Sequence, residues 1–233
     1  MNTSYQLSVD TGRLAIENGT ANPKWFRPDV DPHNIRNLMQ KSDAIAIRDT
    51  AIWLGMMIVS AGCAVAFWPS VWSVPFWLVY GVLYGSAADS RWHECGHKTA
   101  FKTTWMNNAV YQLASFMIIR NPAIWQASHV RHHTDTIIVG RDPEIVAMRP
   151  PDLARIALAF VGVVDVYIAF KRMILHASGR IDPEEATYVA AKDHAKVFRV
   201  ARIWLFIYGC TIAAAILMTS LLPLMLIGFP RLY

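Results

Sequence analysis

The chain has 233 residues, of which 54% are hydrophobic and only 17% are charged, and its formal net charge is +5. This composition excludes an ordinary soluble domain and indicates an integral membrane protein. The Lys and Arg residues are scattered along segments that flank apolar runs. The positive charge therefore does not indicate a nucleic-acid partner.

Residues 1–49 are polar and mixed, and Pro23, Pro28 and Pro32 interrupt any long helix there. No basic segment with a short apolar core opens the chain, so we expect no cleaved signal peptide. We interpret residues 1–49 as a cytoplasmic N-terminal segment and residues 50–233 as the membrane domain.

The run from Thr50 to Ala88 contains no Asp, Glu, Lys, Arg or His. A membrane span needs about 20 apolar residues, so this run predicts two helices, Thr50–Phe67 and Val71–Ala88, joined by a turn at Trp68-Pro69-Ser70. Lys and Arg residues flank both ends of the hairpin. The positive-inside rule therefore places both ends in the cytoplasm.

Two further apolar stretches are harder to interpret. Ala109–Ile119 is too short to span a membrane and predicts a core or interfacial segment. Residues 153–175 could form a third span, but a single crossing there would put the basic stretch that follows outside the cytoplasm. We therefore favour an interfacial helix, in which Asp165 faces water.

The last apolar run, Ile203–Phe229, is longer than one span and contains Pro223. We expect a third membrane helix to cross here and a fourth to begin near Ser220, with the chain ending at Tyr233 part-way through it. The predicted fold class is all-α: a multi-pass protein with about four membrane helices.

Five of the eight histidines fall in two clusters, His93-Glu94-Cys95-Gly96-His97 and His129-Val130-Arg131-His132-His133. Positions three and four apart share one face of a helix, so the imidazoles of each cluster can point at a common site. Imidazole suits iron, zinc, copper and nickel. One tetrahedral zinc needs fewer nitrogens than five, whereas two metals could use them all.

The amino-acid sequence around these clusters resembles that of the membrane fatty acid desaturase and hydroxylase superfamily. The first cluster reads HECGH and is followed by Ala100-Phe101, and Trp125 to Glu144 reads WQASHVRHHTDTIIVGRDPE. The resemblance implies that His93, His97, His129, His132 and His133 are ligands of two iron ions. It also implies that O₂ oxidises an acyl chain of a membrane lipid, with desaturation favoured.

The same resemblance implies an external electron donor, such as a ferredoxin or a cytochrome-type protein. A bacterial member would lie in the inner membrane with the metal site on the cytoplasmic side. Cysteine usage agrees with a reducing side, because the three cysteines do not form a disulfide framework. Cys95, inside the first cluster, is interpreted as a packing residue.

One departure from the family pattern is a missing third histidine box, HxxHH or a close relative, after the second membrane hairpin. His176 and His194 stand alone before that hairpin, and with His33 they are predicted to be surface residues. We expect either a truncated or split product, or missing ligands that another polypeptide supplies.

Two alternatives to the desaturase hypothesis stay open. The first cluster is also H-E-x-x-H, the signature of zinc hydrolases in which the glutamate, here Glu94, is the general base; a third ligand is then required. An inert or regulatory fragment would hold no tightly bound metal.

Four carboxylates are candidates for orienting the ligand histidines. Glu94, and Asp89 at the end of the second predicted helix, could each orient an imidazole or be solvated. Asp142 and Glu144 could hydrogen-bond ligand histidines, but the sequence around them also reads as a turn, in which Asp is favoured for local reasons.

Overall fold

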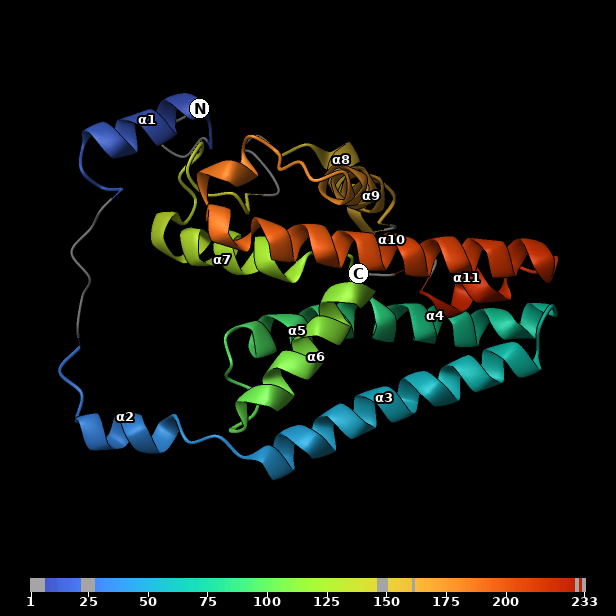
Figure 1. Cartoon of the computed structure of the whole chain (residues 1–233). Coiled ribbons are helices and arrows are strands. Elements are labelled where there is room, and N and C mark those ends of the chain that lie inside the picture. The colour runs from blue at the N-terminus through green and yellow to red at the C-terminus, as the bar shows by residue number, and fades with distance from the viewer. Residues whose placement is uncertain (1–6, 22–27, 146–150, 161, 229–230, 232–233) are drawn as a thin grey trace.

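The computed structural model describes residues 7–21, 28–145, 151–160, 162–228 and 231, and the regular elements of these residues are helices (Figure 1). The predicted all-α fold class is confirmed. The α-helices are α1 Val9–Glu17, α2 Pro32–Leu38, α3 Asp43–Ala66, α4 Val74–Tyr84, α5 Ser86–Gly96, α6 Thr104–Met117, α7 Pro122–Asp135, α8 Leu153–Phe160, α9 Val163–Ala177, α10 His194–Leu217 and α11 Leu222–Leu226. Short 3-10 helices are η2 Val71–Ser73, η3 Glu185–Thr187 and η4 Ala191–Asp193.

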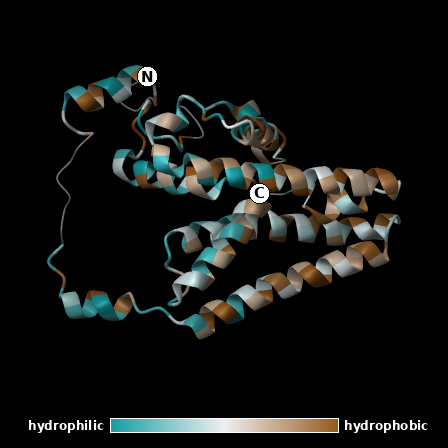
Figure 2. Cartoon of the chain, viewed as in Figure 1, coloured by the Kyte–Doolittle hydropathy of each residue, from teal (hydrophilic) through white to brown (hydrophobic). Residues whose placement is uncertain are grey.

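Three helical segments are long and apolar enough to cross a membrane: Pro32–Ala66, Val71–Gly96 and Ala191–Leu217. The bent pair α8 and α9 would make a fourth. Only 17%, 39% and 22% of the residues in their most apolar windows are buried inside the protein. Apolar side chains therefore face outward, as Figure 2 shows along α3, α4 and α10, and this is what a lipid environment allows. The protein is a multi-pass membrane protein.

The first predicted hairpin is present, but both of its helices are longer than expected. The first begins at Asp43 instead of Thr50. The second continues past Ala88 because α5 follows α4 after a break at Gly85. A prediction from hydropathy places the end of this helix too early, because α5 has polar side chains on one face and its mean hydropathy is low. The first histidine cluster thus lies on the polar end of the second span.

The short apolar segment Ala109–Ile119 belongs to the protein core. Most of it lies on α6, which packs along α5 and buries Tyr111, Ala114 and Met117. Ile118 follows in the same cluster, and Ile119 lies in a second cluster with Met173 of α9 and Trp204 of α10. This segment joins the two halves of the molecule.

The predicted interfacial helix at residues 153–175 is divided in two. α8 and α9 meet at an angle of 79°. Gly162, with φ 64°, precedes α9 in a left-handed conformation that glycine adopts without the steric cost of a side chain. Asp165 is exposed and lies at the cavity described below.

The third predicted membrane helix also begins earlier, at His194 instead of Ile203. Near Ser220, where a fourth was expected, the described residues contain the five-residue helix α11, which folds back on α10. The Tyr80 hydroxyl donates to the Leu226 carbonyl at 2.5 Å and ties α11 to α4. Residues 229–230 and 232–233 of the predicted return helix lie outside the described residues.

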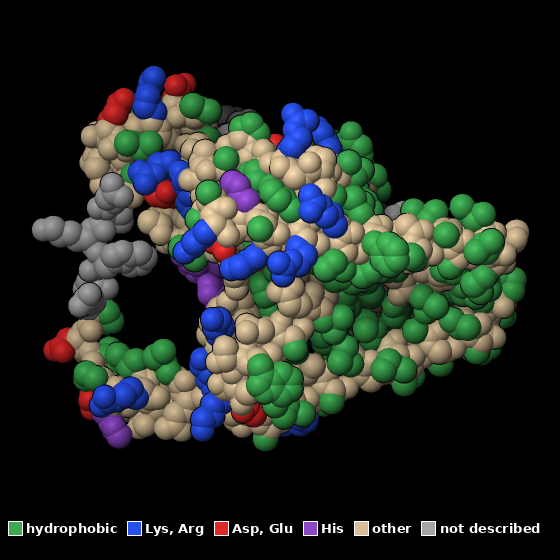
Figure 3. Space-filling view, in the orientation of Figure 1, with side chains coloured by type: hydrophobic (Ala, Val, Ile, Leu, Met, Phe, Trp, Pro, Cys, Tyr) green, Lys and Arg blue, Asp and Glu red, His purple; other side chains and the backbone are tan. Residues whose placement is uncertain are grey.

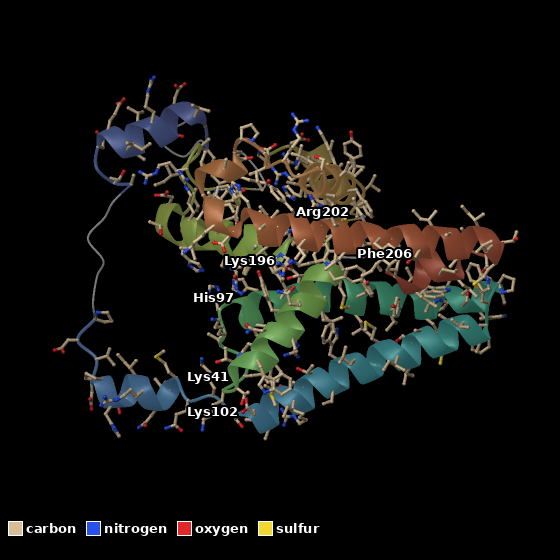
Figure 4. The ribbon with its side chains drawn as sticks, viewed as in Figure 1. Lys41, His97, Lys102, Lys196, Arg202 and Phe206 are labelled. Atoms are coloured by element: carbon tan, nitrogen blue, oxygen red, sulfur yellow. The ribbon has the colours of Figure 1, made fainter. Side chains whose placement is uncertain are left out.

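One end of the molecule is charged and the other is apolar. Figure 3 shows Lys and Arg side chains gathered at the end where histidines appear, while the opposite end is covered by hydrophobic side chains. Figure 4 places His97, Lys41, Lys102 and Lys196 at the charged end, and Phe206 further along α10. Phe206 is 73% exposed, which suits contact with lipid.

Candidate metal centre

Helix α5 carries His93 on its outer face, and His97 directly follows the last residue of the helix. Its other face buries Ala88, Trp92 and Cys95 against the core, at helical spacing. His93 and His97, four positions apart, are exposed, and their ring centroids lie 4.7 Å apart. The packing role predicted for Cys95 agrees with its burial.

Helix α7 carries the other three histidines and is anchored at its start. Asn121 caps the helix by accepting from the Ala123 N–H at 3.2 Å, and Pro122 occupies the first helical position, where its missing N–H costs nothing. The Asn121 amide also donates to the Val197 carbonyl of α10 at 3.1 Å. The cap therefore fixes α7 against the third span.

Two tryptophans and a glycine bring α5 and α7 together. The Trp125 ring lies 3.5 Å from Trp92 and stacks on His129 at 4.2 Å between centroids. A Cβ atom on Gly96 would lie 2.4 Å from the Trp125 ring. Gly96 is therefore the residue that allows the first histidine cluster to approach the second.

Four imidazoles converge between these helices. One ligand nitrogen from each of His93, His97, His129 and His133 lies within 4.8 Å of the other three. The Nε2 atoms of His97 and His129 are 2.9 Å apart, those of His129 and His133 are 3.0 Å apart, and those of His97 and His133 are 3.3 Å apart.

This donor set fits a metal ion. Imidazole nitrogens bound to one first-row metal at about 2.0–2.1 Å lie roughly 3.3 Å apart in a tetrahedral arrangement. The three Nε2–Nε2 separations, 2.9, 3.0 and 3.3 Å, are close to that value, so the four imidazoles could share one cation.

Two carboxylates after α7 orient two of the histidines. Glu144 Oε2 lies 2.8 Å from Nδ1 of His129, and its other oxygen accepts from the Ser128 hydroxyl at 2.8 Å. Both oxygens of Asp142 lie 3.0 Å from Nδ1 of His132. A carboxylate at Nδ1 keeps the proton there, so each Nε2 presents its lone pair, as a metal ligand must.

The turn interpretation of this segment is also correct. Asp142 accepts backbone N–H groups of Ile137 and Glu144, so one side chain both closes the turn and contacts His132. That histidine lies outside the convergent set of four, with its ring centroid 5.8 Å from that of His133.

The other two predicted carboxylates contact arginines. Asp89 pairs with Arg120 at 2.9 Å, and Glu94 pairs with Arg91 at 3.9 Å. Within the described part of the chain, neither forms a hydrogen bond or ion pair with any of the five histidines.

Burial and crowding favour the neutral form of two of the imidazoles. Packing against neighbouring groups lowers the pKa of His97, and the imidazoles of His129, His93 and His133 lower it further. Burial also lowers the pKa of His129, although hydrogen bonding to Glu144 acts in the opposite direction. Neutral imidazole is the form that binds metal.

The prediction that His176 is a surface residue is wrong. His176 is 3% exposed, and its Nε2 lies 2.6 Å from Oε2 of Glu185, which is 1% exposed. Arg172 lies 3.7 Å from the other Glu185 oxygen. The isolated position of His176 in the sequence gave no signal of this pair, because Glu185 comes from a different element. His33 is exposed as predicted, and His194 is half-buried.

A cavity of about 920 Å³ opens beside the histidine cluster. His93, His129 and Glu144 line it together with apolar side chains of α8, α9 and α10, among them Ile156 and Trp204. His176 and Glu185 line it as well. No local sequence pattern indicates this cavity, because its walls come from segments far apart in the chain.

The sequence model of the family described as "Fatty acid desaturase" matches residues 66–233. An "Omega-6 fatty acid desaturase, endoplasmic reticulum isozyme 1" of Glycine max is 32% identical over 85 residues, which are 35% of this chain and 22% of that protein. A "Bifunctional fatty acid conjugase/Delta(12)-oleate desaturase" of Punica granatum is 30% identical over 126 residues, 52% of this chain and 31% of that protein.

The chain thus spans about a third or less of the length of these curated relatives. No solved structure matches it. The family match nevertheless covers most of the chain and includes both histidine clusters and the turn with the two carboxylates. On these grounds the chain belongs to the fatty acid desaturase family.

Proposed function

We propose that this protein oxidises a fatty acyl chain with O₂ at a histidine-bound di-iron centre, and that the outcome is desaturation. The observation that carries the proposal is the convergence of four imidazoles at the charged end of apolar helices. The desaturase names of its relatives support the reaction class.

The five histidines predicted from sequence are the proposed iron ligands. His93, His97, His129 and His133 would hold one metal ion between α5 and α7. His132, whose Nδ1 is held by Asp142, would offer its Nε2 to the second. When bound, iron would supply the oxygen-activating redox chemistry that an unactivated C–H bond requires.

The overall reaction balances with an external donor. Two hydrogens leave adjacent carbons of the acyl chain, and two electrons and two protons are added, so that O₂ is reduced to two waters. The chain's own residues bind and orient the reactants. We assign the acyl chain to the cavity that begins at His93 and His129, because most of the lining from α8 to α10 is apolar, although Arg155, Asp165 and Arg172 also line it.

The electron donor is proposed to dock at the charged end. Exposed lysines surround the first histidine cluster there: Lys41, Lys98, Lys102 and Lys196. Such a surface suits an acidic ferredoxin or a cytochrome-type protein. The positive-inside rule supports a cytoplasmic position for this end.

Metal content of the purified chain tests the proposal most directly. Protein expressed with iron and zinc both available should contain iron, up to two ions per chain, by elemental analysis in detergent. One zinc per chain would instead support the HExxH hydrolase, and absence of metal would support a fragment that needs ligands from elsewhere. Among the described residues, Glu94 pairs with Arg91 at 3.9 Å and with none of the five histidines.

A further inference from the structure

The segment that carries Asp142 and Glu144, residues 136–144, is here termed the carboxylate turn. It is closed by its own hydrogen bonds: Asp142 accepts from the N–H of Ile137 at 2.7 Å and of Glu144 at 2.9 Å. Ile137 has φ 66°, a conformation that a β-branched residue rarely adopts. Such a backbone persists only when its surroundings hold it in place.

One side of the carboxylate turn is fixed to α7 by an ion pair. Asp135, the last residue of α7, is 3% exposed. Arg141 in the turn pairs with it at 2.9 Å, and Arg131 one helical turn earlier pairs with it at 3.6 Å. These contacts hold the base of the turn.

The N-terminal helix α1 packs against the outer side of the same turn. Figure 1 shows α1 beside the end of α7 and the segment that follows it. Gly12 is buried, and a Cβ atom there would lie 2.4 Å from the Val139 carbonyl oxygen and 3.2 Å from the Val139 nitrogen. Two backbones therefore meet at a distance that only glycine permits.

The sequence of α1 is consistent with a docked helix. Glycine inside a helix costs about 1 kcal/mol relative to alanine, so α1 would be more stable alone with another residue at position 12. Ser8 and Thr11 form a capping box that offsets part of this cost. The close approach to Val139 accounts for a glycine inside this nine-residue helix.

We propose that α1 clamps the carboxylate turn and thereby positions Asp142 and Glu144 against His132 and His129. Gly12 is thus a positioning residue for the histidine cluster. The clamp lies outside residues 66–233, where the family match falls. Its consequence for metal binding rests on the proposed function, whereas the clamp itself does not.

Hydrogen exchange of the metal-free chain tests the clamp. Gly12→Ala should raise amide exchange of residues 136–144 about tenfold, because the new Cβ pushes α1 off Val139. Cobalt(II), used as a visible-absorbing probe, should bind about three- to tenfold more weakly, with an altered absorption spectrum, because the carboxylates no longer fix their histidines. The matched control is Gly55→Ala in α3, where a Cβ meets nothing within 4 Å.

Alanine favours helix, so Gly12→Ala could stabilise α1 if α1 does not pack against the turn. An increase in helix content with unchanged exchange at residues 136–144 would overturn the clamp. If Gly12→Ala raised exchange throughout the chain, a second variant, Ser8→Ala, would test the clamp. It removes the hydrogen bond that caps α1 and adds no volume next to the turn. Faster exchange in α1 with an unaffected turn would then refute the proposal. If Gly12→Ala raised exchange of residues 136–144 as expected but the unsubstituted chain bound no cobalt(II), the metal site would be refuted and the clamp would stand.

Discussion

Two carboxylates at the histidine cluster fix which ring nitrogen of their histidine carries the proton. Glu144 and Asp142 each contact Nδ1 of a histidine, at 2.8 and 3.0 Å, and so leave Nε2 for a cation. Glu94, which the HExxH motif would make a general base, contacts Arg91 instead.

Glu144→Gln should weaken metal binding about 10- to 100-fold, as loss of an orienting partner does in other metal sites. A neutral amide interacts more weakly with the Nδ1–H of His129 and reduces the basicity of its Nε2. Competition with a chelator would measure the change in affinity.

Glu94→Gln is the matched control. It makes the same chemical change at an exposed residue that pairs with Arg91 and, among the described residues, with none of the five histidines. It should leave metal affinity within about twofold. Equal losses in both variants would argue that neither carboxylate acts through its histidine.

At the scale of elements, the site depends on how closely α5 approaches α7. Trp92 and Trp125 fill the interface, and Gly96 leaves room for the Trp125 ring. The rings are rigid and buried, so the interface has little capacity to adjust to added volume. Helix packing and ligand geometry are therefore coupled.

Gly96→Ala should lower the free energy of unfolding by about 1–3 kcal/mol, the usual cost of overpacking. The added Cβ would lie 2.4 Å from the Trp125 ring and would separate the two histidine clusters. Thermal unfolding in detergent, followed with metal content, measures both effects.

Gly62→Ala in α3 serves as the control, because a Cβ there meets nothing within 4 Å. This substitution should leave the unfolding midpoint unchanged or slightly raised, since alanine favours helix. Retention of full stability and metal content by Gly96→Ala would contradict the proposed interface.

For the whole molecule, the charged surface is separated from the apolar surface. The apolar helices expose large side chains such as Phe206 and Ile216, while the exposed lysines lie at the end that holds the histidines. Long-range attraction between this end and an acidic protein acts over about 10 Å at ordinary ionic strength.

Reduction of the iron-loaded protein by an acidic ferredoxin should therefore slow several-fold as salt rises from about 0.05 to 0.5 M, as charge-steered association does. Lys102→Glu should slow it at low salt and reduce the salt dependence. Stopped-flow absorbance measures these rates.

A small uncharged reductant provides the control, because its encounter with the protein is not steered by charge. Its rate should be independent of both salt and the Lys102 substitution. Loss of rate with both reductants would mean that the substitution damages the metal site instead of a docking surface.

The features that the sequence predicted correctly are local in the chain. Helical periodicity brings His93 and His97 to one face, and hydropathy summed over about 20 residues identifies the first hairpin. The segment Ala109–Ile119 was recognised as too short to span and lies in the core. Each of these conclusions depends on neighbours within one element.

The tertiary structure alone decided which distant groups meet. The pairing of His176 with Glu185 and the cavity between α7 and α10 both join separate elements. Gly12 against Val139 does the same across most of the chain. A periodic pattern reports which face of a helix is apolar, but the partner of that face is selected by packing of the whole chain, which no local window contains.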